Sequence, residues 1–175
     1  MSWAPPWSDI GGDHRALAPG CYRIEWDDFK SCFAASDQPE RSSQLQDLAD
    51  YLELLKGHGL VIPHVLVDGS FTTTKRVPAD IDVSPVMDYE ASRPDAEIAK
   101  HAHANFIHPK DRYKTTPVPG LGRTVSLDIY GFVIVSPGHT HFDHCQTNEM
   151  YWREWWQRSR TSGMATKGYL EVKLP

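Results

Sequence analysis

The sequence predicts an α/β (α+β) fold in which helices flank a mixed β-sheet. Three observations support this prediction: an amphipathic pattern in residues 43–55, a nearly continuous apolar run in residues 60–67, and an alternating apolar and polar segment in residues 124–135. Apolar positions that recur every three or four residues indicate a helix, and a short apolar run is typical of a strand buried on both faces. Helices and strands in this order favour a sheet with helices packed against it.

The chain length fits one domain rather than two. At 175 residues it is long enough for an ordinary hydrophobic core. The first twenty residues are rich in Pro, Gly and Trp without any period, so we expect an irregular N-terminal arm over residues 1–20. Residues 21–175 are then expected to form a single domain.

Composition and charge exclude several classes of protein. Hydrophobic residues make up 40% and charged residues 23%, which is typical of a soluble globular protein. A net charge of −5 disfavours a protein whose whole task is to grip nucleic acid. The three cysteines form no CxxC pair, the start shows no signal-peptide pattern, and no apolar stretch approaches the ~20 residues that span a bilayer. We therefore expect a reduced, cytoplasmic protein that is not inserted in a membrane.

Eight segments carry a secondary-structure pattern. Asp27 and Asp28 suit the start of a short helix, and Ser43 with Gln46 matches a capping box at the start of a longer one. Gly57 is expected near the end of that longer helix. In chain order, the sequence predicts helix 26–33, helix 43–57, strand 60–67, strand 79–83, helix 95–106, strand 124–135, helix 149–160 and strand 169–174.

Chemistry-bearing residues follow the apolar strand of residues 60–67. Gly69 lets the backbone turn sharply and approach a ligand, while the Ser70 hydroxyl and the following amides can donate to phosphate oxygens. Asp80 and Asp82 are spaced by two residues on the next strand, so they point to the same face and can share a divalent metal. Asp128 lies on the polar face of a later strand and can complete a cage of three carboxylates. Hard oxygen ligands of this kind suit Mg²⁺.

The segment GSFTTTKRVPADIDV resembles the signature of the DNA polymerase β-type nucleotidyltransferase superfamily. That signature is a Gly-Ser at a strand end, an Asp-hydrophobic-Asp about ten residues later, and a third Asp on a later strand. The segments LAPGCYRIEWDDF, GSFTTTKRVPADID and RTSGMATKGYLEVKL together resemble a group of small bacterial members of this superfamily. The resemblance covers most of the chain.

The resemblance implies a nucleotidyltransferase-like fold and site. Gly69 and Ser70 would bind the triphosphate, and Asp80, Asp82 and Asp128 would be catalytic and hold Mg²⁺ or Mn²⁺, with Asp128 also the general base. The Arg-Gly that usually follows the Gly-Ser is replaced here by Lys75 and Pro78, so Lys75 is the candidate phosphate contact. Template-directed synthesis is not expected, because the chain has no room for template-binding domains.

A competing motif, HTHFDH, places three histidines and an aspartate in residues 139–144. It resembles the zinc-binding motif of the metallo-β-lactamase fold, and imidazoles at this density can bind Zn²⁺. That fold needs a further histidine well downstream, and none occurs after His144. We interpret the segment as a loop that lines the nucleotide site or binds metal adventitiously.

Three other groups have a structural and a functional interpretation. The positive run from Lys110 to Arg123 is typical of a solvated loop. Arg158, Arg160 and Lys167 could bind a triphosphate or an anionic partner, but their pattern favours a solvated helix end. Trp152, Trp155 and Trp156 are spaced by three and four residues, which favours core packing over a base-stacking platform.

The function predicted first is transfer of a nucleotidyl group from a nucleoside triphosphate such as ATP, with Mg²⁺, to an acceptor hydroxyl on a protein, an RNA end or a small molecule. A second hypothesis is a nucleotide-binding regulatory or antitoxin-like protein with little turnover, because small members of this superfamily often belong to toxin-antitoxin modules. A third is a zinc hydrolase that uses His139, His141 and His144. The sequence does not distinguish the base or the acceptor.

Overall fold

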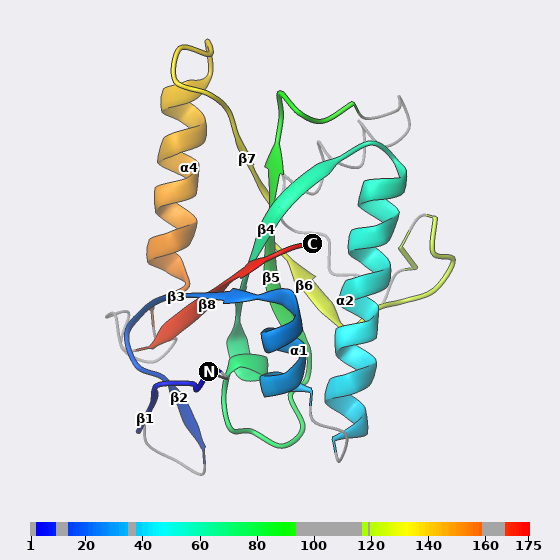
Figure 1. Cartoon of the computed structure of the whole chain (residues 1–175), viewed down its shortest axis with the longest axis vertical. Helices are drawn as coiled ribbons and strands as arrows, with labels where there is room; N and C mark the ends of the chain where they lie inside the picture. Colours follow the sequence, from blue (N-terminus) through cyan, green and yellow to red (C-terminus); the bar gives the residue numbers. More distant parts are fainter. Residues whose placement is uncertain (1–2, 10–13, 35–37, 94–116, 119, 159–166) are drawn as a thin grey trace.

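The computed structural model describes residues 3–9, 14–34, 38–93, 117–118, 120–158 and 167–175. A six-stranded mixed sheet forms its centre, with α1 (Trp26–Phe33) and α2 (Pro39–Gly57) on one face and α4 (Phe142–Trp155) on the other (Figure 1). The predicted fold class, a mixed sheet flanked by helices, is therefore confirmed. Among the described residues, no helix is both long and apolar enough to cross a membrane.

The strand order of the sheet is β3-β8-β4-β5-β6, with β7 paired to β5 beyond β6. β8 is parallel to β3 and antiparallel to β4, β5 is antiparallel to β4, and β6 and β7 are both parallel to β5. The strands are β3 (Gly20–Glu25), β4 (Val61–Asp68), β5 (Ile81–Asp88), β6 (Leu127–Ile129), β7 (Phe132–Ile134) and β8 (Gly168–Lys173).

The two helices on the first face largely follow the predicted pattern. α1 (Trp26–Phe33) has the predicted bounds. α2 (Pro39–Gly57) ends at the predicted residue but begins four residues before Ser43, with proline in its first turn, where the missing N–H costs no hydrogen bond. The predicted capping box is therefore wrong, and the Gln46 amide instead donates to Asp50 Oδ1 at 2.7 Å.

The predicted long strand over residues 124–135 is two short strands, β6 and β7. Both pair with β5 in one continuous register, from Val83 opposite Ile129 to Val86 opposite Phe132. Pro85 lies in β5 between these two paired stretches and has no N–H to donate to the ladder. The gap between β6 and β7 therefore lies opposite a residue that cannot donate to the ladder.

The N-terminal arm contains regular structure that we did not predict. β1 (Trp7–Asp9) and β2 (Arg15–Leu17) form an antiparallel pair in which Trp7 lies opposite Leu17. Leu17 is buried, and Trp7 meets Phe33 of α1 edge to face with ring centroids 5.9 Å apart. The arm therefore covers one end of the core.

α4 (Phe142–Trp155) begins seven residues before the predicted helix start at Glu149. Asp143 lies in its first turn, where negative charge suits the helix dipole. Arg153 holds α4 to the sheet through Glu171 of β8 at 2.7 Å and also pairs with Glu149 at 2.8 Å. The predicted helix 95–106 lies outside the described residues, as does most of the positive run from residue 110 to 123.

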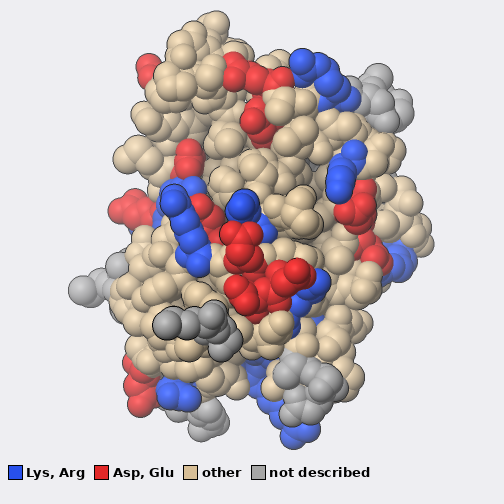
Figure 2. Space-filling view, in the orientation of Figure 1, with Lys and Arg blue, Asp and Glu red and all other residues tan. Residues whose placement is uncertain are grey.

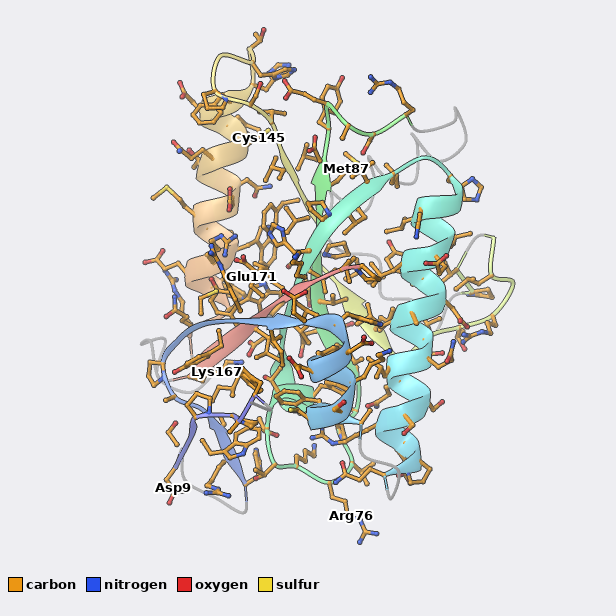
Figure 3. All side chains as sticks on the ribbon, viewed as in Figure 1. Asp9, Arg76, Met87, Cys145, Lys167 and Glu171 are labelled. Carbon is orange, nitrogen blue, oxygen red and sulfur yellow. The ribbon has the colours of Figure 1, made fainter. Side chains whose placement is uncertain are left out.

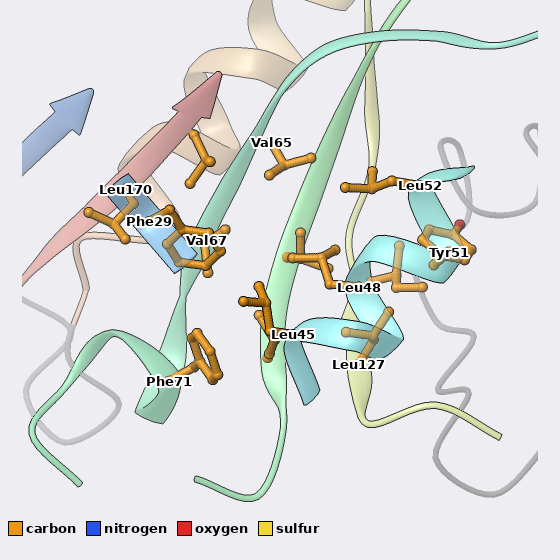
Figure 4. Close-up of a cluster of buried hydrophobic side chains, with 14 of the residues drawn as sticks. Phe29, Leu45, Leu48, Tyr51, Leu52, Val65, Val67, Phe71, Leu127 and Leu170 are labelled. Carbon is orange, nitrogen blue, oxygen red and sulfur yellow. The ribbon is translucent and has the colours of Figure 1, made fainter. Parts of the chain in front are cut away.

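Two apolar clusters pack on the two faces of the sheet. The larger one joins α1, α2 and the sheet, and Figure 4 shows its side chains converging between them. The smaller one joins α4 to the opposite face. Alternation along each strand separates the two sets, so Val65 and Val67 of β4 face α2 while Leu66 faces α4. Side chains on the α4 face include the acids described next.

Candidate functional site

Three acids stand side by side on neighbouring strands. Asp68 of β4 lies opposite Asp82 of β5, and Asp82 lies opposite Asp128 of β6. Residues directly opposite in a sheet share a face with Cβ atoms about 4.5–5.5 Å apart. All three are buried, with exposed fractions of 1%, 4% and 4%. We call Asp68, Asp82 and Asp128 the acid row.

The acid row differs from the predicted set of carboxylates. Asp82 and Asp128 were predicted and are neighbours in the sheet. Asp80 was predicted too, but it precedes the first residue of β5 and is half-buried. Asp68 was not predicted, although it directly precedes Gly69 at the end of the buried strand. The order Asp-Gly-Ser was the one signal that could have pointed to it.

Asp68 is held by a cation and by hydrogen bonds. Its Oδ2 forms an ion pair with Lys167, and its Oδ1 accepts a hydrogen bond from the Thr72 hydroxyl at 3.5 Å. Burial raises the pKa of Asp68, and the ammonium group of Lys167 and the Gly69 N–H counteract that rise. Lys167 is therefore part of the site, although its sequence context favours a solvated helix end.

Gly69 fits where no other residue would. It begins a short 3₁₀ turn, η1 (Gly69–Thr72), and its φ of +77° is strained for any residue with a side chain. A β-carbon added to it would overlap Oδ2 of Asp82 and lie 2.8 Å from Cγ, closer than real β-carbons approach other atoms. The backbone of the turn thus lies directly against the carboxylate of Asp82. Ser70 follows within the turn and is half-buried.

The loop from Phe71 to Pro78 is fixed by two side chains of α2. Arg41 is buried and donates to the carbonyls of Phe71 at 2.8 Å, Thr73 at 2.7 Å and Lys75 at 2.6 Å, and also to that of Phe33 at 3.1 Å. Gln44 donates to the Pro78 carbonyl at 2.8 Å. The Lys75 side chain, the predicted phosphate contact, is exposed. The backbone between Gly69-Ser70 and β5 is therefore held on one helix.

The same helix fixes the segment that leads into β6. Asp47 accepts hydrogen bonds from the backbone N–H of Ser126 at 2.8 Å and from Arg123 at 2.5 Å, and Asp50 also pairs with Arg123. Arg123 is thus engaged with α2 and is not part of a positive loop surface. In the face shown in Figure 2, positive and negative side chains are interspersed, and no broad basic surface covers it.

Aromatic side chains from the C-terminal half of α4 lie next to the acid row. The indole N–H of Trp156 donates to the hydroxyl of Ser84 at 3.0 Å, and Ser84 lies two residues after Asp82 on the same face. Trp152 and Trp156 are buried, as predicted for core residues. The prediction is wrong for Trp155, which is 45% exposed and stacks on Tyr151 with ring centroids 5.9 Å apart.

The histidine motif lies far from the acid row. His139 contacts Tyr89, just beyond the end of β5, with ring centroids 5.5 Å apart. Tyr89 is seven residues from Asp82 along an extended chain, which is about 23 Å at ~3.3 Å per residue. The interpretation that this segment lines the same site as Asp82 is therefore wrong. His144 also lies within α4 and not in a loop.

No group of three His, Cys, Asp or Glu side chains among the described residues is arranged to hold a metal ion. This holds for the histidine motif and for the carboxylates. His139 and His141 have ring centroids 5.6 Å apart, and the His139 Nδ1 accepts a hydrogen bond from the His141 backbone N–H at 3.2 Å. The three-carboxylate cage stays a prediction.

Comparison with known protein families assigns the sequence to one of them. A family of unknown function, DUF6932, matches residues 11–173. The chain belongs to the DUF6932 family. No curated protein matches it, and no solved structure does. The DUF6932 match includes the acid row, the Gly69-Ser70 turn, α2 and Lys167, so every part of the candidate site lies within the family's own extent.

In this DUF6932 protein the site combines negative charge with a tight backbone turn. Asp82 and Asp128 are adjacent carboxylates, and Mg²⁺ in proteins commonly uses one or two carboxylates and completes its shell with water and phosphate oxygens. The donor set therefore fits a hard divalent cation shared by two residues. Asp82 and Asp128 would hold such a cation, and the Gly69 turn adjoins the Asp82 carboxylate.

Proposed function

We propose that this protein is a nucleotidyltransferase of the DNA polymerase β type that uses a nucleoside triphosphate with Mg²⁺ or Mn²⁺. One observation carries the proposal: Asp82 and Asp128 lie in register on adjacent strands, and the backbone of Gly69 rests against the Asp82 carboxylate. Of the predicted signature, the glycine turn thus contacts one acid, Asp82, and a second acid, Asp128, lies next to it on the adjacent strand.

The proposed reaction moves a nucleotidyl group to an acceptor hydroxyl on a protein, an RNA end or a small molecule. The acceptor oxygen forms a bond to the α-phosphorus, the bond from that phosphorus to the bridging oxygen breaks, and pyrophosphate leaves. Asp128 is the proposed general base, which takes the proton of the acceptor hydroxyl. Gly69 and Ser70 are proposed to bind the triphosphate, with Lys75 as a further candidate contact.

Asp82 and Asp128 would hold the divalent cation, and Asp80, which directly precedes β5, is the proposed third ligand. When bound, the cation supplies positive charge that offsets the charge of the phosphates. α2 contributes by fixing both backbone segments that lead to these acids, through Arg41 and Asp47. Fixed positions matter because phosphoryl transfer depends on positioning and electrostatics.

A transfer assay tests the proposal. The purified protein is incubated with each labelled nucleoside triphosphate, Mg²⁺ and cell extract, and label is sought on protein, RNA and small molecules. We expect transfer by the wild type and loss of about a hundredfold or more with Asp82→Asn or Asp128→Asn. Asp27→Asn, at an exposed acid of α1, is the matched control. Absence of both transfer and nucleotide binding would contradict the proposal.

The second candidate is a nucleotide-binding regulatory or antitoxin-like protein with little turnover. The observation that favours it is that Asp80 is half-buried outside the acid row and that no three carboxylates of the described residues are grouped around one point. Nucleotide binding that survives Asp128→Ala, without transfer, would support this candidate. A toxin or antitoxin gene next to its own would support it further.

The third candidate, a zinc hydrolase at His139, His141 and His144, has less support, because these histidines and the described acids form no group of three metal ligands. Zinc analysis of protein purified without an affinity tag tests it.

Cys21, Cys32 and Cys145 are all free thiols, which favours the reducing cytoplasm that we propose as the location.

A further inference from the structure

We infer that Lys167 is the cation of this site that contacts the substrate's phosphates, and that Asp68 is the positioning residue that orients it. The inference rests on the proposed function and deepens it, because it assigns a residue for the triphosphate that the family signature does not supply. The ligand class is a polyphosphate chain bound together with a divalent cation.

The position of Lys167 follows from the pairing of β8 with β4. Val67 lies opposite Leu170 in this antiparallel pair. Lys167 lies three residues before Leu170, and its ammonium group pairs with Asp68, the last residue of β4 before the glycine turn. Figure 3 labels Lys167 at the start of β8, close to the turn that follows β4. The pairing of β8 with β4 therefore places Lys167 next to the segment proposed to bind phosphate.

The ion pair with Asp68 gives Lys167 a defined orientation. Asp68 lies at the β4 end of the row, and its carboxylate is buried, whereas the Lys167 side chain keeps 22% of its surface exposed. An ammonium group carries three N–H donors, so the bond to Asp68 leaves it able to donate to another acceptor. Lys167 thus contacts a buried anion while its own side chain remains partly exposed.

The negative charges of the acid row explain why Asp68 pairs with Lys167 while a divalent ion is assigned to the other two acids. Three carboxylates on adjacent strands repel one another and attract cations. Lys167 offsets the charge of Asp68. Asp82 and Asp128 are the two acids proposed to hold the divalent ion. A phosphate chain bound together with that ion would accept a hydrogen bond from the Lys167 ammonium group. The exposed Lys75 lacks any comparable anchor among its described contacts, which are backbone bonds to Arg41 and Thr73.

The test compares two variants that both remove the charge of Asp68. Asp68→Asn keeps Lys167, and the double variant Asp68→Asn with Lys167→Met removes both charges, so neither leaves a buried carboxylate without its cation. Lys173→Met is the matched control, since Lys173 is the last residue of β8, is largely exposed and pairs with Glu25 at 3.7 Å. Calorimetry measures binding of Mn²⁺ alone, and of inorganic tripolyphosphate and nucleoside triphosphates with Mg²⁺.

We expect opposite shifts for the two ligands. Relative to Asp68→Asn, the double variant should bind tripolyphosphate and nucleoside triphosphates about tenfold or more weakly, because a charge-assisted hydrogen bond is lost. It should bind Mn²⁺ alone roughly threefold more tightly, because a positive charge next to the acids is gone. A merely structural role for Lys167 would weaken both or change neither, and either result would overturn the inference.

Failure of the proposed function gives a different pattern. If the wild type and Asp68→Asn bind no nucleoside triphosphate, the proposed function is contradicted and the inference with it. If both bind nucleotide and the double variant binds it equally well, the role of Lys167 alone is contradicted. An unchanged Lys173→Met shows that loss of a positive charge elsewhere on β8 does not produce the effect.

Discussion

The α-carbon of Gly69 packs directly against the carboxylate of Asp82, so that a β-carbon at this position would overlap Oδ2 of the acid. The glycine is therefore required twice: by its φ of +77° and by the close approach of the acid. Contact between a backbone turn and an acid of the next strand joins the two halves of the predicted signature into one structural unit.

Gly69→Ala should destabilise the protein by about 2 kcal/mol or more, because alanine would be strained at this φ and would displace Asp82. Gly57→Ala is the matched control: nothing lies within 4 Å of the added β-carbon, and its helical position should gain up to about 1 kcal/mol. Urea unfolding measures both. Equal effects of the two substitutions would contradict the close approach of Gly69 and Asp82.

Arg41→Lys should cost about 3 kcal/mol or more, although the charge is kept, because a single ammonium group cannot reach the four carbonyls that the guanidinium serves. The loop from residue 71 to 78 should also become easier to cleave in limited proteolysis. Arg76→Lys, at an exposed position in the same loop, is the control and should leave both measurements unchanged. A stable, protease-resistant Arg41→Lys would refute the role assigned to Arg41.

Trp156→Phe should lower the free energy of unfolding by about 1–3 kcal/mol, because it removes the hydrogen bond to Ser84 and part of a buried side chain. Its neighbour Trp155 is exposed, so Trp155→Phe should change stability by no more than about 0.5 kcal/mol. The two variants carry the same chemical change one residue apart. If Trp155→Phe were the more destabilising, the placement of α4 on the sheet would be wrong.

His64→Phe should reduce the loss of stability at acid pH. Burial lowers the pKa of His64, although the nearby Glu171 opposes this, and its Nε2 has no hydrogen-bond partner among the described residues. As pH falls below about 6.5, the unfolded chain takes up a proton that the folded chain still excludes, so wild-type stability declines until the lowered pKa is reached.

Urea unfolding of the wild type and of His64→Phe between about pH 5 and pH 8 measures this difference. The two stability curves should diverge below about pH 6.5, with the variant losing less. Parallel curves across this range would show that His64 takes up its proton equally well in the folded and unfolded chains.

Local sequence pattern accounts for much of the fold and for part of the site. The bounds of α1 were predicted, and those of β8 within one residue, because alternation and acidic residues at a helix start are local signals. The same signals predicted Asp82 and Asp128 on strands. That they would be direct neighbours depends on β6 pairing with β5 in one register, and no local pattern specifies which strands pair.

Arg41, Asp68 and Lys167 show why the rest of the site could not be predicted. An arginine in the first turns of an amphipathic helix usually points to solvent, and Arg41 is buried only because the loop after η1 folds back over it. Asp68 and Lys167 are 99 residues apart in sequence and meet through the antiparallel pairing of β4 and β8. Their roles arise from tertiary contacts, which composition and spacing do not encode.

Errors at the other end of the molecule have a similar origin. Residues 124–135 were predicted as one strand, yet β6 and β7 are separated opposite Pro85 of the partner strand, which has no N–H to donate. The HTHFDH segment has the density of a metal site, but part of it is the first turn of α4, which spreads its side chains around the helix. For residues 124–135 the feature that was missed is a residue of the partner strand, and for the HTHFDH segment it is the helical conformation.

The spacing of Arg41, Gln44 and Asp47 along α2 limits how the chain can change in length. These three residues are one turn apart on one side of the helix, and together they hold the segments that lead into β5 and β6. One extra residue between Gln44 and Asp47 would turn the rest of the helix by about 100° and release the segment before β6 while that before β5 stayed attached. Insertions should therefore be tolerated beyond Gly57 but not within this stretch of α2.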